Sequence, residues 1–67
     1  MSMFEKDALV IHLKTSGAYV IKLTPEDDLR IEASNEPAYA YRALEGGPVW
    51  VRPSAEMEDG RFKEWKQ

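Results

Sequence analysis

The sequence predicts a mainly β fold that consists of one small, strongly curved antiparallel sheet. Residues 8–14, 18–23 and 38–53 alternate between apolar or aromatic side chains and other types, which is the pattern of strands. The last stretch is interrupted at residues 45–48, where two glycines can take the positive φ angles of a hairpin turn. With 67 residues, the chain forms a single domain close to the lower size limit for independent folding.

The first two alternating runs predict a hairpin. Residues 15–17 join them, and Gly17 suits the left-handed position of a three-residue loop with a bulge. This loop pairs Leu13 with Tyr19, Ile11 with Ile21, and Leu9 with Leu23. One face of the hairpin is then wholly apolar, and a slip by one residue would bring Lys22 beside Ile11. We therefore expect burial to fix this register.

Residues 24–33 leave two alternatives open. Thr24, Pro25 and the acids after them combine a helix-capping residue, proline at the first helical position and negative charge in the first turn. Residues 29–33 alternate, however, and then meet a cluster of turn-forming residues. We expect a turn at residues 24–28 followed by a short strand at residues 29–33, with a short helix as the alternative.

The central hairpin concentrates aromatic and basic side chains on one face. A Gly-Gly turn pairs Ala43 with Trp50 and Tyr41 with Arg52. Because side chains alternate along a strand, this face carries Tyr39, Tyr41, Trp50 and Arg52. The opposite face is also partly apolar, which suits a sheet that curves and closes on itself.

The end of the chain completes the predicted fold. Residues 54–57 predict one helical turn, and Phe62 and Trp65 are expected to seal the end of a barrel. The sequence thus predicts a small curved antiparallel sheet or SH3-like mini-barrel of about five short strands, with at most one or two single helical turns. We expect residues 1–7 to be a flexible N-terminal segment and residues 8–67 to form the single small β-domain.

Charge and composition argue against several classes of protein. Twelve acidic and nine basic residues give a formal net charge of −3, whereas binding to a phosphate backbone needs a stripe of Lys and Arg. Direct nucleic-acid binding is therefore not expected. The chain has no cysteine, so neither a disulfide framework nor a thiolate metal site is available. No apolar run approaches the roughly 20 residues of a membrane span, and we expect a cytoplasmic protein without a membrane partner.

The sequence offers little material for catalysis. His12 is the only histidine, and general acid–base chemistry would need it beside a carboxylate in a cleft. Its predicted position is in the middle of a strand, with no nucleophile nearby in sequence. A histidine or cysteine metal site would need further ligands of these types, which the chain lacks. We expect no catalytic residue, no metal ligand set, no cofactor and no enzyme activity.

Two acidic segments are the first candidate for a contact surface. Solvated turns are the ordinary interpretation of such runs. The sharper hypothesis is a negative surface that docks on the basic groove of a partner protein. Its residues are Glu26, Asp27, Asp28, Glu56, Glu58 and Asp59.

The aromatic and basic face of the central hairpin is the alternative binding surface. Arginine beside aromatic rings is a combination that binding hot spots favour, and such rings can also stack on the bases of a single-stranded nucleic acid. This surface would consist of Tyr39, Tyr41, Trp50 and Arg52. The same rings could instead fill the core, and for Trp50 the core position is the favoured interpretation.

Four motifs run along residues 12–63. They are H-x-K-x-x-G-x-Y from His12 to Tyr19, Y-R-x-L from Tyr41 to Leu44, W-V-R-P from Trp50 to Pro53, and E-x-x-D-G-R-F from Glu56 to Phe62. In this pattern the chain resembles a family of small domains of unknown function from bacteria, phages and prophages. It departs from the family by one extra residue in the first motif and by a more acidic run in the last. The resemblance implies a compact β-rich domain with no established catalytic activity and no active site to carry over.

Size, charge and this resemblance together predict a non-enzymatic protein-binding module of phage or prophage type, acting in the cytoplasm of a bacterial host. Small acidic phage proteins can disable a host defence complex such as a restriction or CRISPR effector. The acidic segments would then imitate nucleic-acid phosphates against a basic groove. The alternative is an SH3-like module that binds nucleic acid or a peptide through the aromatic and arginine face.

Overall fold

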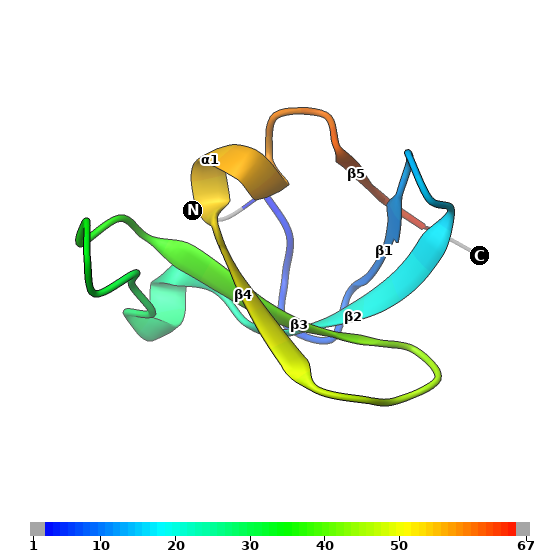
Figure 1. The fold of residues 1–67 in the computed structure, drawn as a ribbon, viewed down its shortest axis with the longest axis horizontal. Helices are drawn as coiled ribbons and strands as arrows, with labels where there is room; N and C mark the ends of the chain where they lie inside the picture. The colour runs from blue at the N-terminus through cyan, green and yellow to red at the C-terminus, as the bar shows by residue number, and fades with distance from the viewer. Residues whose placement is uncertain (1–2, 66–67) are drawn as a thin grey trace.

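The computed structural model describes residues 3–65 and shows one five-stranded antiparallel sheet (Figure 1). The strands follow the order β4-β3-β2-β1-β5 across the sheet. Their bounds are Leu9–His12 for β1, Gly17–Leu23 for β2, Ala38–Ala43 for β3, Val49–Pro53 for β4 and Phe62–Glu64 for β5. The predicted fold class, a small and mainly β protein with a strongly curved antiparallel sheet, is confirmed. Within the described residues β4 and β5 do not pair, so the curved sheet stays open between them.

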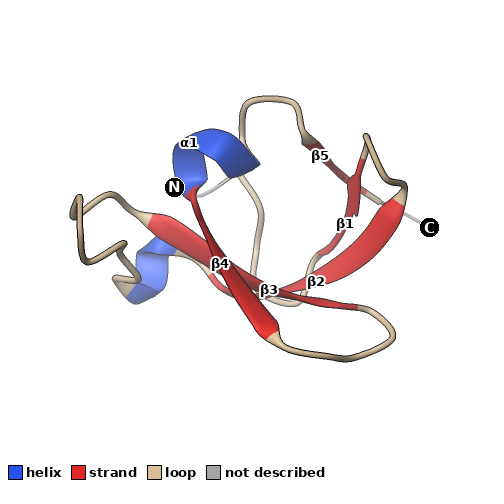
Figure 2. Ribbon diagram, viewed as in Figure 1, coloured by secondary structure: helices blue, strands red, loops and turns tan. Residues whose placement is uncertain are grey.

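Two short helical turns connect the strands (Figure 2). The 3₁₀ turn η1 covers Pro25–Asp27, and its cap is Thr24, whose side chain accepts a hydrogen bond from the backbone N–H of Glu26. The helix α1 covers Ser54–Met57. The helix α1 lies where the sequence predicts a single helical turn. At residues 25–27 the structure takes the helical form that was the alternative to a plain turn, because Thr24 caps it and proline favours helical geometry at the first position.

The strand expected at residues 29–33 is not a regular strand. Only Arg30 forms a bridge, with Pro37. The backbone N–H groups of Ser34 and Asn35 both bond to the carbonyl of Ile31, at 3.3 and 2.6 Å. This local turn folds the segment back on itself before a ladder can form, because turn-forming residues follow too closely.

The predicted register of the first hairpin is wrong. The observed pairs are Leu9 with Val20, Val10 with Tyr19, Ile11 with Ala18, and His12 with Gly17. The loop is longer than predicted, and Ser16 rather than Gly17 takes the left-handed conformation, with φ 61°. The resulting slip is an odd number of residues, so β1 turns its other face inward. Val10 is therefore buried in place of Leu9 and Ile11.

The central hairpin is also shifted, but by two residues. Tyr41 pairs with Trp50 and Tyr39 with Arg52, around a five-residue loop in which Gly46 and Gly47 have φ 108° and 113°. An even shift leaves every side chain on its original face. The predicted grouping of these four residues on one face is therefore retained.

The core lies on the inner face of the curved sheet. Its buried side chains are Phe4, Val10, Ile21, Tyr39, Tyr41, Met57 and Phe62. Figure 1 shows α1 and the N-terminal segment over the concave side, which explains how Phe4 and Met57 reach this core. Phe62 is buried and Trp65 is 44% exposed, so only the first of these two predicted sealing residues closes the core.

The N-terminal segment contributes to the core, although the sequence predicts it to be flexible. Phe4 is 1% exposed and its ring packs edge-on against Tyr39, with 5.8 Å between the ring centroids. Its backbone N–H donates to the hydroxyl of Tyr39 at 3.2 Å. Asp7 adds a backbone hydrogen bond to the carbonyl of Ile21 at 2.8 Å. Residues 1 and 2 of the predicted segment lie outside the described residues.

Candidate functional site

Two of the four residues of the predicted aromatic and arginine face belong to the core. Tyr39 and Tyr41 are buried, and the Tyr41 ring packs edge-on against Tyr19 and Phe62. Trp50 lies on the same face but is 53% exposed, so the expectation that it fills the core is wrong. The physical reason is that β4 is the outermost strand at its margin of the sheet. A side chain there has packing partners on one side only.

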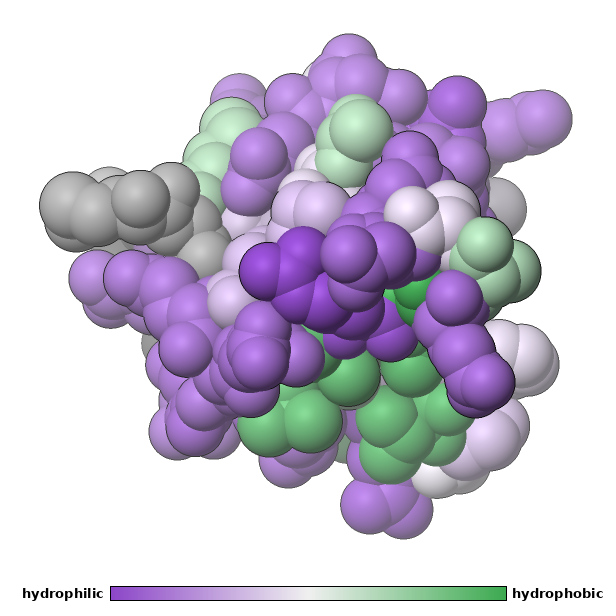
Figure 3. Space-filling view, turned by 90° about the vertical axis from the view of Figure 1, so that its left-hand side faces the viewer, coloured by the Kyte–Doolittle hydropathy of each residue, from purple (hydrophilic) through white to green (hydrophobic). Residues whose placement is uncertain are grey.

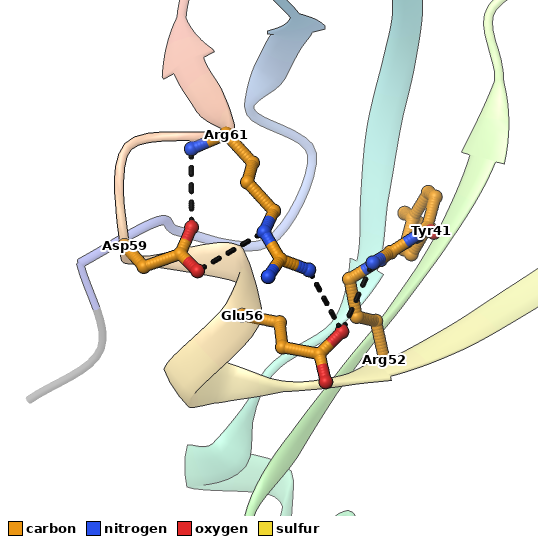
Figure 4. Close-up of polar contacts among 5 residues, drawn as sticks. All are labelled: Tyr41, Arg52, Glu56, Asp59 and Arg61. Atoms are coloured by element: carbon orange, nitrogen blue, oxygen red, sulfur yellow. Dashed lines mark hydrogen bonds and ion pairs between the residues drawn. The ribbon is translucent and has the colours of Figure 1, made fainter. Parts of the chain in front are cut away.

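Arg52, the fourth member of this face, is held in the structure by polar contacts (Figure 4). Its Nε donates to the hydroxyl of Tyr41 at 3.2 Å, and its Nη1 donates to Oε1 of Glu56 at 3.0 Å. The guanidinium carbon lies 5.8 Å from the centroid of the Phe62 ring. The hydrogen bond to Tyr41, together with Glu56, raises the pKa of Arg52 above its ordinary value. Arg52 is therefore a permanent cation in a fixed position.

A cleft of about 590 Å³ opens beside Arg52. It is lined by His12, Leu13, Lys14, Arg52 and Arg61, and we call it the cationic cleft. These residues come from the end of β1 and the loop after it, from β4 and from the turn before β5. The pairing of β1 with β5 brings the first of these segments beside the last.

Arg61 faces Arg52 across a shared carboxylate. Its Nη1 lies 3.1 Å from the same Oε1 of Glu56 that Arg52 contacts, and its Nε lies 3.1 Å from Asp59. Figure 4 shows the two guanidinium groups converging on Glu56. Two like charges held this close need an anion between them, and here Glu56 supplies it.

His12 forms part of the cleft wall in a packed position. Its ring lies 4.8 Å from that of Phe62, and its Nδ1 lies 3.0 Å from the hydroxyl of Thr15. Sequence reasoning missed Lys14 and Arg61 as site residues. The only available signal was their presence in the first and last motifs, and nothing in the chain showed that these motifs meet in space.

The two acidic segments are largely occupied with internal contacts. Asp28 pairs with Arg30 at 3.0 Å, whereas Glu56 and Asp59 hold the arginines of the cationic cleft. Glu58 accepts hydrogen bonds from the hydroxyl of Tyr39 and from a backbone N–H of the N-terminal segment. Figure 2 shows the two helical turns well separated, with β3 and β4 passing between them in the view. Most of the acidic side chains therefore contribute to the structure of the domain.

Asp27 closes the cap of η1. Its carboxylate accepts the backbone N–H of Thr24 at 3.0 Å and pairs with Lys6 at 3.1 Å. The backbone hydrogen bond, followed by the contact with Lys6, lowers the pKa of Asp27 below its ordinary value of 3.8. Since the folded form favours the ionised carboxylate, Asp27 stabilises the folded state. This contribution is complete above pH 3.8 and is lost as the pH falls through the lowered pKa.

We therefore expect Asp27→Asn to lower the urea midpoint of unfolding at pH 7 and to have a steadily smaller effect below pH 3.8. Urea titrations of both proteins at several pH values measure this difference. Asp28→Asn is the control, because Asp28 forms a highly exposed pair and should change the midpoint little. If Asp27→Asn lowered the urea midpoint by the same amount at pH 2 as at pH 7, the ionic explanation would be contradicted.

The outer face of the sheet carries three exposed aliphatic side chains of the central hairpin. Leu44, Val49 and Val51 are 54%, 54% and 50% exposed. The β ladders continue this surface through half-buried residues of β1 and β2, namely Leu9, Ile11, Ala18 and Val20. We call these seven residues the apolar outer face. Figure 3, which views the left-hand side of Figure 1, shows apolar surface gathered in its lower part, the level of β4 and its loop.

The backbone of β4 is accessible next to this surface. Ser54 donates its N–H to the carbonyl of Pro37 at 2.9 Å. The even-numbered residues along this strand therefore point their backbone N–H and C=O groups toward β3. In an antiparallel ladder the alternate residues point their backbone groups away. Val49 and Val51 therefore direct their N–H and C=O groups outward from the margin of the sheet.

Comparisons with protein-family models, with curated proteins and with solved structures found no match. The resemblance drawn from the motifs stays a prediction. Among residues 3–65, no three His, Cys, Asp or Glu side chains gather in a way that could hold a metal ion. No helix in the same range is long and apolar enough to cross a membrane. The class that the fold defines is a small domain with one curved antiparallel sheet.

Proposed function

We propose that this protein is a non-enzymatic protein-binding module that docks through the apolar outer face. The observation that carries this proposal is the exposure of Leu44, Val49 and Val51, each about half open to solvent on one hairpin. Burying apolar surface contributes roughly 25 cal/mol per Å². Apolar surface that is contiguous on a small domain commonly marks an interaction site.

Charges on this face indicate the chemistry of the partner. Arg42 pairs with Val20 and Val49 in the ladders and therefore lies within the apolar outer face, where it is exposed. Lys63 pairs with Ile11 and lies at its far margin. Apolar contacts ringed by complementary charge are typical of specific interfaces. The partner that fits is a different protein whose apolar patch has one carboxylate within it, opposite Arg42, and another at its margin, opposite Lys63, because a second copy would bring the same cations.

The more specific prediction of a phage-encoded inhibitor that acts on a host defence complex in the cytoplasm is also a protein-binding role. It differs in the surface used, since it relies on the two acidic segments. The ion pairs of Asp27, Asp28, Glu56 and Asp59 reduce the negative charge that these segments offer. We therefore favour the apolar outer face as the docking surface.

A matched pair of leucines tests this proposal. Leu44 and Leu13 are 54% and 53% exposed, but only Leu44 belongs to the apolar outer face. We expect a photo-cross-linking residue at Val49 to capture one stoichiometric partner, Leu44→Lys to abolish the capture, and Leu13→Lys to leave it intact. Nuclear magnetic resonance spectra of both variants confirm that the fold is kept.

Three results would contradict the proposal. The first is equal capture by the two lysine variants. The second is cross-linking from a probe at Glu58 but not from Val49, which would favour the acidic segments. The third is salt-dependent binding of a single-stranded oligonucleotide that Trp50→Ala removes, which would favour the nucleic-acid alternative.

A further inference from the structure

We infer that the cationic cleft is a binding site for a phosphate group, either free or carried by a small organic molecule. This site is independent of the proposed docking surface. Its guanidinium groups come from the inner face and from the turn before β5, whereas the apolar outer face lies on the other side of the sheet.

The first argument is the arrangement of donors. Arg52 and Arg61 both reach the same carboxylate oxygen, so their planar groups lie side by side. The contacts of Arg52 use Nε and Nη1, and those of Arg61 use the same two atoms. Within the described residues the Nη2 nitrogen of each arginine makes no hydrogen bond. Two neighbouring guanidinium groups with donors left over form a geometry that suits the several oxygens of a phosphate.

The second argument is the charge balance of the cleft. The cleft is lined by three cations, Lys14, Arg52 and Arg61, whereas only two carboxylates, those of Glu56 and Asp59, pair with its arginines, which leaves an excess of positive charge. Lys14 is exposed and forms no ion pair in the part of the chain that the structure describes. This cation is therefore available to a ligand, on a protein whose overall charge is negative.

The third argument is the rigidity and size of the site. Tyr41 and Phe62, both in the core, hold Arg52 by a hydrogen bond and by ring contact. An arginine fixed in this way loses little freedom when a ligand binds. A volume of about 590 Å³ exceeds the need of a bare phosphate ion and falls in the range of small-molecule sites. Glu56 competes with a bound phosphate for the two arginines, because its carboxylate lies between them.

Titration with inorganic phosphate and with phenyl phosphate at constant ionic strength tests this inference, followed by nuclear magnetic resonance of the backbone and arginine side chains. We expect saturable shifts centred on Lys14, Arg52 and Arg61, with sodium acetate binding at least about tenfold more weakly, since it offers only two oxygens and one charge. Similar affinities for the two phosphates would identify free phosphate as sufficient. Tighter binding of phenyl phosphate would identify an organic phosphate monoester.

Matched variants separate specific binding from general attraction of anions. Lys14→Gln and Lys63→Gln each remove one exposed lysine charge, but only Lys14 lines the cleft. We expect Lys14→Gln and Arg61→Gln to weaken phosphate binding several-fold, Lys63→Gln to leave it unchanged, and Glu56→Gln to strengthen it. Equal weakening by Lys14→Gln and Lys63→Gln, or shifts that never saturate and spread over all cations, would overturn the inference.

Discussion

Replacing Phe4 by alanine is expected to unfold most of the protein at room temperature. Phe4 is 1% exposed and lies in the core beside Tyr39. Truncating a buried phenylalanine typically costs about 3–5 kcal/mol. A single core in a chain of this length seldom supplies more than roughly 3–5 kcal/mol in total. The loss therefore equals the whole stability of the domain.

Thermal and urea unfolding followed by circular dichroism would measure this effect. Met3→Ala is the matched control, because Met3 precedes Phe4 and is 59% exposed. Its unfolding free energy should change by less than about 0.5 kcal/mol. If Phe4→Ala were as stable as the parent protein, residues 3–7 would not be part of the folded domain. The flexible N-terminal segment predicted from the sequence would then be the better description.

Tyr41→Ala and Trp50→Ala are expected to differ strongly in their loss of stability, although the two residues face each other across one ladder. Tyr41 and Trp50 are cross-strand partners on the inner face, but Tyr41 is buried and Trp50 is 53% exposed. Tyr41→Ala would remove ring contacts with Tyr19 and Phe62 and the hydroxyl that accepts from Arg52. We expect a loss of about 3 kcal/mol or more, whereas Trp50→Ala should cost less than about 1 kcal/mol.

Urea unfolding of both variants, monitored by circular dichroism, checks this contrast. Tyr41→Phe serves as a further control, since it keeps the ring and removes only the hydrogen bond, at a cost of about 1 kcal/mol. If Trp50→Ala destabilised the protein as much as Tyr41→Ala, the tryptophan would be a core residue. That result would restore the position that sequence reasoning favoured.

The fold class could be predicted because β-structure has a local signal. Alternation in residues 18–23 and 38–53 has a period of two, and positive φ angles at Gly46 and Gly47 mark the hairpin loop. The grouping of Tyr39, Tyr41, Trp50 and Arg52 on one face followed from the same period. It was retained although the register was wrong by two residues, because an even shift preserves the faces.

The first hairpin shows why register could not be predicted in the same way. Val10, Leu9 and Ile11 are all apolar, so either face of β1 could be buried at similar cost. The choice was made by the four-residue loop at residues 13–16 and by the pairing of β1 with β5. Neither feature has a signal in the alternation of β1 itself.

The candidate sites depended even more on distant contacts. The acidic segments and the aromatic face were visible as local composition, yet the structure occupies most of the acids with cations and buries two of the rings. The cationic cleft was not visible at all. Lys14 and Arg61 are far apart in the sequence and meet only because His12 pairs with Phe62.

The sequence by itself therefore determined the secondary structure class, the loop with two glycines, the helical turn at residues 54–57 and the face shared by β3 and β4, since each depends on neighbours within a few residues. The tertiary structure alone decided that Phe4 is buried, that Trp50 is exposed and that Arg52 meets Arg61 around Glu56. Burial and charge pairing of this kind depend on which strand lies at the margin of the sheet and which strands pair over long separations. Those choices are made by packing of the whole chain, for which no single segment carries the information.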